Sequence, residues 1–228
     1  EGKQLTVYSN KVTLEEDKSN NNAMILPFPS DENVRFIDLT SCKHIFKYLK
    51  ISFKEQLKKG KKGSARSATN DTLEVIEVGS YRVSVVNSLD DFKYVSQEVF
   101  TLDPDVASYL KDFYSNGYSF LVCNLKPNAK YHPFAYVHNT LSGGNLFIPT
   151  RHFHLDEKGN QHTDWDHCIY TMSSVINKSF KVSHTTYTVP YSWDKFCRLT
   201  GLNVDDISKV SQYTIRNYHK NHDIVAEV

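Results

Sequence analysis

Alternation of apolar and polar residues is the dominant pattern in this chain, and it predicts β-strands along most of the length. A period of two places successive side chains on opposite faces, so such runs indicate strands with one buried face. Pro27 and Pro29 are expected to end one of these runs, because proline cannot donate to the ladder of a central strand. The expected strands span residues 5–8, 11–14, 23–26, 34–39, 73–78, 81–86, 118–125, 134–137, 145–155, 161–172 and 181–189.

Helical periodicity is confined to shorter stretches between these runs. The clearest start is Asp103, a capping carboxylate, followed by Pro104 at the first helical position. Gly117 is expected to close the same helix. A short helix is expected after a cap at Thr40 or Ser41. Four more helices, each preceded by a Ser, Asp or Asn cap, are expected over about residues 89–99, 104–115, 193–199 and 204–218.

Together these elements predict an α+β protein with a mainly antiparallel sheet and four to five short helices packed against it. A length of 228 residues suffices for one domain with a buried core, and we expect a single domain over residues 1–228. Residues 54–70 are expected to form a flexible basic loop, because they lack an apolar period. This loop is not expected to separate two domains, since the first fifty residues bury too little surface to fold alone.

One stretch resembles a known family. Residues 78–126 contain a strand, a helix beginning with Ser-Leu-Asp-Asp, a second helix ending in Tyr-Ser-Asn-Gly-Tyr and a Phe-Leu-Val strand. This order resembles a domain of unknown function found in bacterial exported proteins. The resemblance covers about a fifth of the chain. It implies an α+β fold, and because the family has no assigned activity it implies no reaction.

Composition excludes several classes of protein. Hydrophobic residues make up 39% and aromatic residues 13% of the chain, with 14 Tyr and 13 Phe, and the net charge is +1. No apolar run approaches the ~20 residues of a membrane-spanning helix, so a soluble protein is expected. The sequence contains no GxSxG, P-loop or GxGxxG motif. No two of the cysteines form a CxxC pair, which excludes a zinc ribbon or a thioredoxin-type site: Cys42, Cys123, Cys168 and Cys197.

The chemistry of the sequence is concentrated in a His- and Asp-rich stretch between Pro149 and Tyr170. The turn Glu157-Lys158-Gly159 suits a three-residue hairpin loop with glycine in the left-handed position. In that register His154 faces His162 and His152 faces Asp164, with all four side chains on one face. Three imidazoles and a carboxylate could hold a divalent ion such as zinc or iron. The candidate metal ligands are therefore His152, His154, His162 and Asp164.

The metal hypothesis depends on that register. A slip by one residue would move His162 and Asp164 to the opposite face and remove the site. His167 points to the other face in this register and is a reserve ligand. In the enzyme that the site would form, a hydrolase or an oxygenase-like protein, Asp166 or Glu157 would act as a base on metal-bound water. The motif matches only the beginning of the metallo-β-lactamase signature, and its fit to a cupin barrel is poor. The favoured alternative is a surface strand whose solvent face carries ordinary polar residues.

A second candidate site is the basic loop over residues 54–66, in which six cationic side chains are accompanied by Glu55 alone. Such a segment could contact the phosphates of a nucleic acid or a membrane surface. Between Lys54 and Arg66 there is no aromatic residue to stack on bases, so a solvated loop is favoured over nucleic-acid binding. The candidate phosphate-binding residues are Lys58, Lys59, Lys61, Lys62 and Arg66.

The function that these observations favour is a non-catalytic structural or protein-interaction domain. Exposed Tyr and Phe side chains would then contact a protein partner, either a second copy or another protein. A metal-dependent enzyme on the His/Asp cluster and phosphate contact through the basic loop are the alternatives. No cofactor is required by the sequence apart from the divalent metal of the first alternative.

Overall fold

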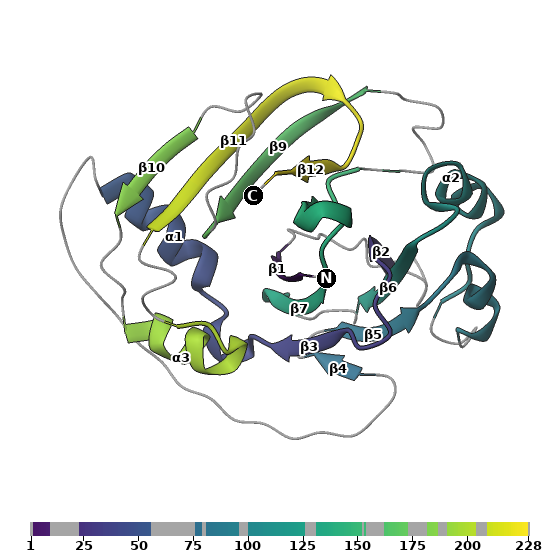
Figure 1. Cartoon of the computed structure of the whole chain (residues 1–228), viewed down its shortest axis with the longest axis horizontal. Coiled ribbons are helices and arrows are strands. Elements are labelled where there is room, and N and C mark those ends of the chain that lie inside the picture. Colours follow the sequence, from purple (N-terminus) through teal and green to yellow (C-terminus); the bar gives the residue numbers. More distant parts are fainter. Residues whose placement is uncertain are drawn as a thin grey trace, which may run out of the picture.

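The computed structural model describes residues 2–9, 23–55, 76–78, 81–95, 100–125, 131–151, 153, 162–172, 182–186, 191–203 and 209–227. Antiparallel sheets dominate, with helices packed around them, so the α+β prediction is confirmed (Figure 1). Helices are fewer than expected, since the described residues form three α-helices and three short 3-10 helices. The elements in chain order are β1 (Lys3–Tyr8), β2 (Ala23–Pro29), β3 (Arg35–Asp38), η1 (Thr40–Cys42), α1 (Ile45–Glu55), β4 (Ile76–Val78), β5 (Tyr81–Val86), η2 (Leu89–Tyr94), α2 (Pro104–Tyr114), β6 (Tyr118–Leu125), β7 (Phe134–Asn139), η3 (Ser142–Gly144), β8 (Leu146–Ile148), β9 (His162–Thr171), β10 (Val182–Thr186), α3 (Tyr191–Thr200), β11 (Lys209–Lys220) and β12 (Ile224–Ala226).

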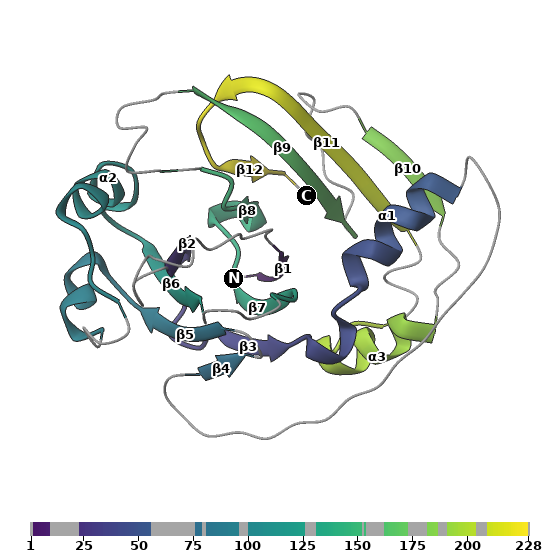
Figure 2. The same ribbon diagram turned by 180° about the vertical axis from the view of Figure 1, so that it is seen from behind.

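Strand β7 lies in the middle of the molecule and contributes to two cores. It pairs with β1 on one side and β3 on the other. Phe134 and Tyr136 pack against the sheet of order β2-β6-β5-β4, whereas Ala135 packs with Trp193 and Phe196 of α3. Figures 1 and 2 show β1 and β7 at the centre, with the β10-β11-β9 sheet arching past them on one side. The core is therefore divided by a central sheet rather than gathered on one face of it.

Strand β2 is longer than the sequence predicted, because it continues through both prolines. Pro27 pairs with Phe120 and Pro29 with Tyr118 in the register of β2 and β6. The explanation is that β2 stands at the edge of its sheet. Two prolines two residues apart direct their nitrogens to the same side, and at an edge this side can be the one away from β6, where no donor is required.

The helices follow their local signals closely at α2 and less closely elsewhere. The Asp103 carboxylate accepts a hydrogen bond from the Asp105 backbone N–H at 2.8 Å, which confirms the predicted cap. The helix expected over residues 89–99 is the 3-10 helix η2, and Val95 is already extended. The Ser88 hydroxyl donates to the Asp91 carboxylate at 2.7 Å instead of capping the backbone. No helix in the described ranges is long and apolar enough to cross a membrane.

The helix predicted over residues 204–218 is wrong. Residues 209–220 form β11, the central strand of the β10-β11-β9 sheet. Ser211, Tyr213 and Ile215 alternate as buried residues with the partly or fully exposed residues between them. β-Branched and aromatic side chains of this kind favour a pleated sheet, and pairing with strands on both sides outweighs the helical spacing.

A buried polar chain joins β1, β7 and β8. The Gln4 amide bridges the backbone of Phe147, donating to its carbonyl at 2.7 Å and accepting from its N–H at 2.8 Å. The same amide nitrogen donates to the Thr6 hydroxyl, which lies 2.9 Å from His138 Nε2. His138 Nδ1 is 2.7 Å from the Asn139 carbonyl, which can only accept, so Nδ1 carries a proton. In the neutral imidazole, which burial favours, Nε2 then accepts from the Thr6 hydroxyl.

We expect this histidine to destabilise the fold in acid. Burial lowers the pKa of His138 from its ordinary value of 6.5 to about 4, against the opposing hydrogen bond to Asn139. Below pH 6.5 the unfolded chain therefore binds a proton on this histidine, whereas the folded chain does so only near pH 4. The free energy of unfolding falls as the pH drops from 6.5 towards 4. A shift of this size corresponds to about 3 kcal/mol lost at about pH 4. Urea unfolding across this pH range measures the loss.

Two variants isolate the contribution of His138 from that of the carboxylates. His138→Gln removes the titrating group, so its stability should decline less steeply between pH 6.5 and 4. Thr214→Gln changes an exposed side chain that does not titrate and should keep the slope of the parent protein. Equal slopes in all three proteins would contradict the assignment.

Candidate functional site

Strand β9 places the His/Asp-rich stretch on two different faces. His162, Asp164, Asp166 and Cys168 are exposed, whereas Trp165 between them is buried. β9 pairs with β11 along its whole length, with Lys220 opposite His162 and Tyr218 opposite Asp164. Two of the four predicted metal ligands, His162 and Asp164, thus share one solvent-facing side. His152 and His154 lie outside the described residues, so the hairpin register and the metal site remain predictions.

The exposed side chains of β9 have partners on β11. The ring of His162 stacks on Tyr218 with centroids 5.3 Å apart and planes at 18°. The Asp166 carboxylate forms an ion pair with Arg216. In the described part of the chain, no three His, Cys, Asp or Glu side chains are placed to share one metal ion.

The opposite face of β9 brings three histidines around the buried indole of Trp165, and two of them, His219 and His222, are themselves exposed. The ring centroid of Trp165 lies 4.9 Å from His167, 5.2 Å from His222 and 5.9 Å from His219. His167 Nε2 is 3.5 Å from the Thr150 carbonyl, and burial lowers the pKa of this imidazole despite that hydrogen bond. His167 therefore packs beneath the sheet and does not join His162 and Asp164, as the alternation predicted.

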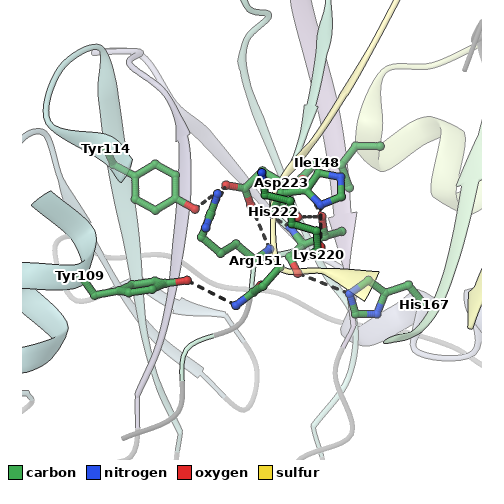
Figure 3. A network of polar contacts seen from close by, with 10 residues as sticks. Tyr109, Tyr114, Ile148, Arg151, His167, Lys220, His222 and Asp223 are labelled. Carbon is green, nitrogen blue, oxygen red and sulfur yellow. Dashed lines mark hydrogen bonds and ion pairs between the residues drawn. The ribbon is translucent and has the colours of Figure 1, made fainter. Parts of the chain in front are cut away.

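Below this cluster, the Asp223 carboxylate holds three chain segments together (Figure 3). It accepts hydrogen bonds from the backbone N–H groups of Thr150 and Arg151, both at 3.0 Å, and from the Tyr114 hydroxyl. The side chain is only 10% exposed, and Arg151 Nε lies 3.7 Å from its second oxygen. We call these four residues, Tyr114, Thr150, Arg151 and Asp223, the Asp223 clamp.

The Asp223 clamp also explains why the strand predicted over residues 145–155 is short. β8 ends at Ile148, and the next amides bind a carboxylate instead of a neighbouring strand. Burial, with the adjacent carboxylate of Asp223, raises the pKa of Tyr114 far above its ordinary value, so the hydroxyl stays protonated and donates. The arrangement is suited to fixing the chain immediately before His152. Reasoning from sequence missed it, because its other members lie 72, 73 and 109 residues from Asp223.

The other candidate residues gain less from the structure. The five basic residues of the predicted phosphate site, Lys58 to Arg66, lie outside the described residues. His132 and His138 are both buried, at 7% and 0% exposure. His138 belongs to β7 and His132 precedes that strand, so both line the interior rather than the exposed face of β9.

Among the residues that the structure describes, large aromatic side chains are exposed at three separate places. Tyr94 is 77%, Tyr218 66% and Phe113 45% exposed. Each has a neighbour that restricts its ring: Lys93 Nζ lies 4.9 Å from the Tyr94 centroid, and the Arg151 guanidinium lies 3.7 Å from that of Phe113. His162 stacks on Tyr218 in the same way. Aromatic rings held like this lose little freedom when another molecule covers them.

Comparison with known proteins identifies a similar fold. No family model and no curated protein matches the chain. The crystal structure of a mutated baculovirus P35 after caspase cleavage is similar over 99% of this chain and 95% of that chain, with a TM-score of 0.50 and 16% identity. The crystal structure of a caspase-8/P35 complex is similar over 99% of this chain and 92% of that chain, with a TM-score of 0.48 and 15% identity. At such identities the likeness concerns the fold alone.

Loss of the Asp223 carboxylate should destabilise the protein strongly. Asp223→Ala leaves the Tyr114 hydroxyl and two backbone N–H groups without their acceptor, and the Arg151 guanidinium without the opposite charge beside it. Uncompensated buried polar and charged groups cost about 3 kcal/mol or more. Asp112→Ala on the exposed face of α2 is the matched control and should change the free energy of unfolding by less than about 0.5 kcal/mol. Equal effects in urea unfolding would show that the Asp223 clamp is not a stabilising centre.

The metal prediction can be tested on the complete chain. If His162 and Asp164 ligate an ion with His152 and His154, protein purified without a histidine tag carries stoichiometric zinc or iron. Each single alanine substitution should then reduce the metal content at unchanged fold. Elemental analysis of the parent protein and the four variants measures this. A metal-free parent protein that regains no zinc on dialysis would refute the site.

Proposed function

We propose that this protein acts by binding another protein, and that this partner is a protease of the caspase class. The observation that carries the proposal is the likeness in fold to baculovirus P35 over nearly the full length of both chains. That structure is of P35 after caspase cleavage, so a protein of this architecture meets a caspase as a substrate. Because unrelated functions can share a fold, the proposal requires a direct measurement.

The surface supports a binding role independently of that likeness. Tyr, Phe and Arg are enriched at protein interfaces, and a few such residues usually supply most of the binding energy. Tyr94, Phe113 and Tyr218 are exposed, and Arg151 stacks on Phe113. Under this proposal the protein contributes contact surface, and the reacting groups belong to its partner.

Inhibition of a caspase is the expected result. The purified chain is added in increasing amounts to an active-site-titrated caspase, and hydrolysis of a fluorogenic peptide is followed. We expect activity to fall in proportion to the added protein and to be lost near a one-to-one ratio. Mass spectrometry of the mixture should reveal a cut at a single bond of the chain.

A variant then separates specific engagement from incidental proteolysis. The residue on the amino side of the cut bond is changed to alanine, and this variant should be neither cleaved nor inhibitory. Cys168→Ser, an exposed change on β9, is the control and should inhibit like the parent protein. Undiminished caspase activity in an excess of intact chain would refute the proposal.

A further inference from the structure

The most distinctive exposed surface of the described chain is the solvent-facing side of strands β9 and β11. Three of its cross-strand rows carry all the charged residues of this face, and every residue in them is exposed. The next row, Cys168 opposite Thr214, is exposed but uncharged, and the face is covered from Tyr170, which packs against Phe46 and Phe53 of α1. We call the three charged rows the outer patch: His162, Asp164, Asp166, Arg216, Tyr218 and Lys220.

Charge is sorted across the outer patch by strand. The β9 column carries two carboxylates, Asp164 and Asp166, whereas the β11 column carries two cations, Arg216 and Lys220. Facing rows pair His162 with Lys220, Asp164 with Tyr218 and Asp166 with Arg216. A surface with an acidic column beside a basic column of equal size is complementary to itself.

Self-complementarity of this kind selects one symmetry. A two-fold axis parallel to the strands lays the β9 column of one copy over the β11 column of the other, so each carboxylate faces a cation or the Tyr218 hydroxyl. An axis in the sheet plane but perpendicular to the strands would place carboxylate against carboxylate, which disfavours association. The charges therefore favour the first arrangement.

We propose that the outer patch is a homodimer interface in which two copies pack face to face about a two-fold axis parallel to β9 and β11. Tyr218 is its central contact. The ring is 66% exposed, and stacking on His162 at 5.3 Å holds it in place before a partner arrives. Its hydroxyl is able to donate to Asp164 of the second copy, and Asp166 and Arg216 of both copies form a four-membered ionic cluster.

The size of the patch sets the strength of the dimer. Three rows on two strands cover less than the ~800 Å² per partner of a typical stable complex. We therefore expect a dissociation constant of roughly tens to hundreds of micromolar. Added salt should weaken the dimer, because its charges are exposed in the monomer.

Sedimentation velocity of the full chain tests the proposal over concentrations from about 10 µM to about 1 mM. The weight-average sedimentation coefficient should rise from that of a monomer towards that of a dimer. Tyr218→Ala should weaken association by about tenfold or more, because the symmetry places the residue in the interface twice. Tyr94→Ala removes a tyrosine that is even more exposed, outside the outer patch, and should leave association unchanged.

A charge exchange supplies the decisive comparison. Asp166→Arg and Arg216→Asp should each abolish the dimer, since each places like charges against one another across the axis. The double variant restores opposite charges within and between copies and should associate again. Far-UV circular dichroism and the monomer sedimentation coefficient report whether each variant is folded. A parent protein that stays monomeric, or a double variant no better than the single variants, would overturn the proposal.

Discussion

Strand β7 is fully buried on one face and largely buried on the other, and the packing of the rest of the chain follows from that constraint. Phe134, Tyr136 and His138 form a row of rings directed at β2, and Ala135 on the opposite face leaves room for α3. The polar side chains of such a strand depend on partners inside the protein, and the buried Tyr136 hydroxyl has no hydrogen-bond partner among the described residues. His138, with no exposed surface, has two, the Thr6 hydroxyl and the Asn139 carbonyl, and a neutral imidazole can accept from the first and donate to the second. The position of β1, and through Gln4 that of β8, depends on this histidine.

The Asp223 clamp provides hydrogen-bond partners for buried polar groups at the periphery, where a carboxylate takes the place of a neighbouring strand. Where β8 ends, the amides of Thr150 and Arg151 lose a strand partner, and a carboxylate from the turn before β12 accepts both. Its charge is balanced by Arg151, whose guanidinium also lies over Phe113 of α2. One carboxylate thereby ties α2, the end of β8 and the C-terminal strands into one unit. The backbone pairing of β8 with β12 already joins two of these segments, and the Tyr114 hydroxyl adds α2 to them through the carboxylate.

Local patterns in the sequence predicted the elements whose signals are themselves local. The cap at Asp103, the apolar run of β6 and the alternation along β9 needed no knowledge of the fold. The prediction of a helix over residues 204–218 was wrong because apolar residues recur there every three residues, as in a helix: Val204, Ile207, Val210 and Tyr213. The strand is determined by pairing with β9 and β10, which the local pattern does not contain. The prediction that Pro27 and Pro29 end the strand was wrong because only the sheet order shows that β2 is an edge strand. The Asp223 clamp had no signal, since its members meet only after the chain has folded.

The alternation of His and Asp residues along β9 is explained first by the structure of the strand. Trp165 must be buried and its neighbours alternate with it, so positions 162, 164, 166 and 168 face water and require side chains that tolerate it. A slip of one residue would bury two carboxylates and expose the indole, and no new pairing across the strands could offset that cost. Histidines and aspartates at these positions therefore fix the register whether or not they bind anything. What distinguishes the face is the separation of its acidic and basic residues onto different strands, which the register does not demand.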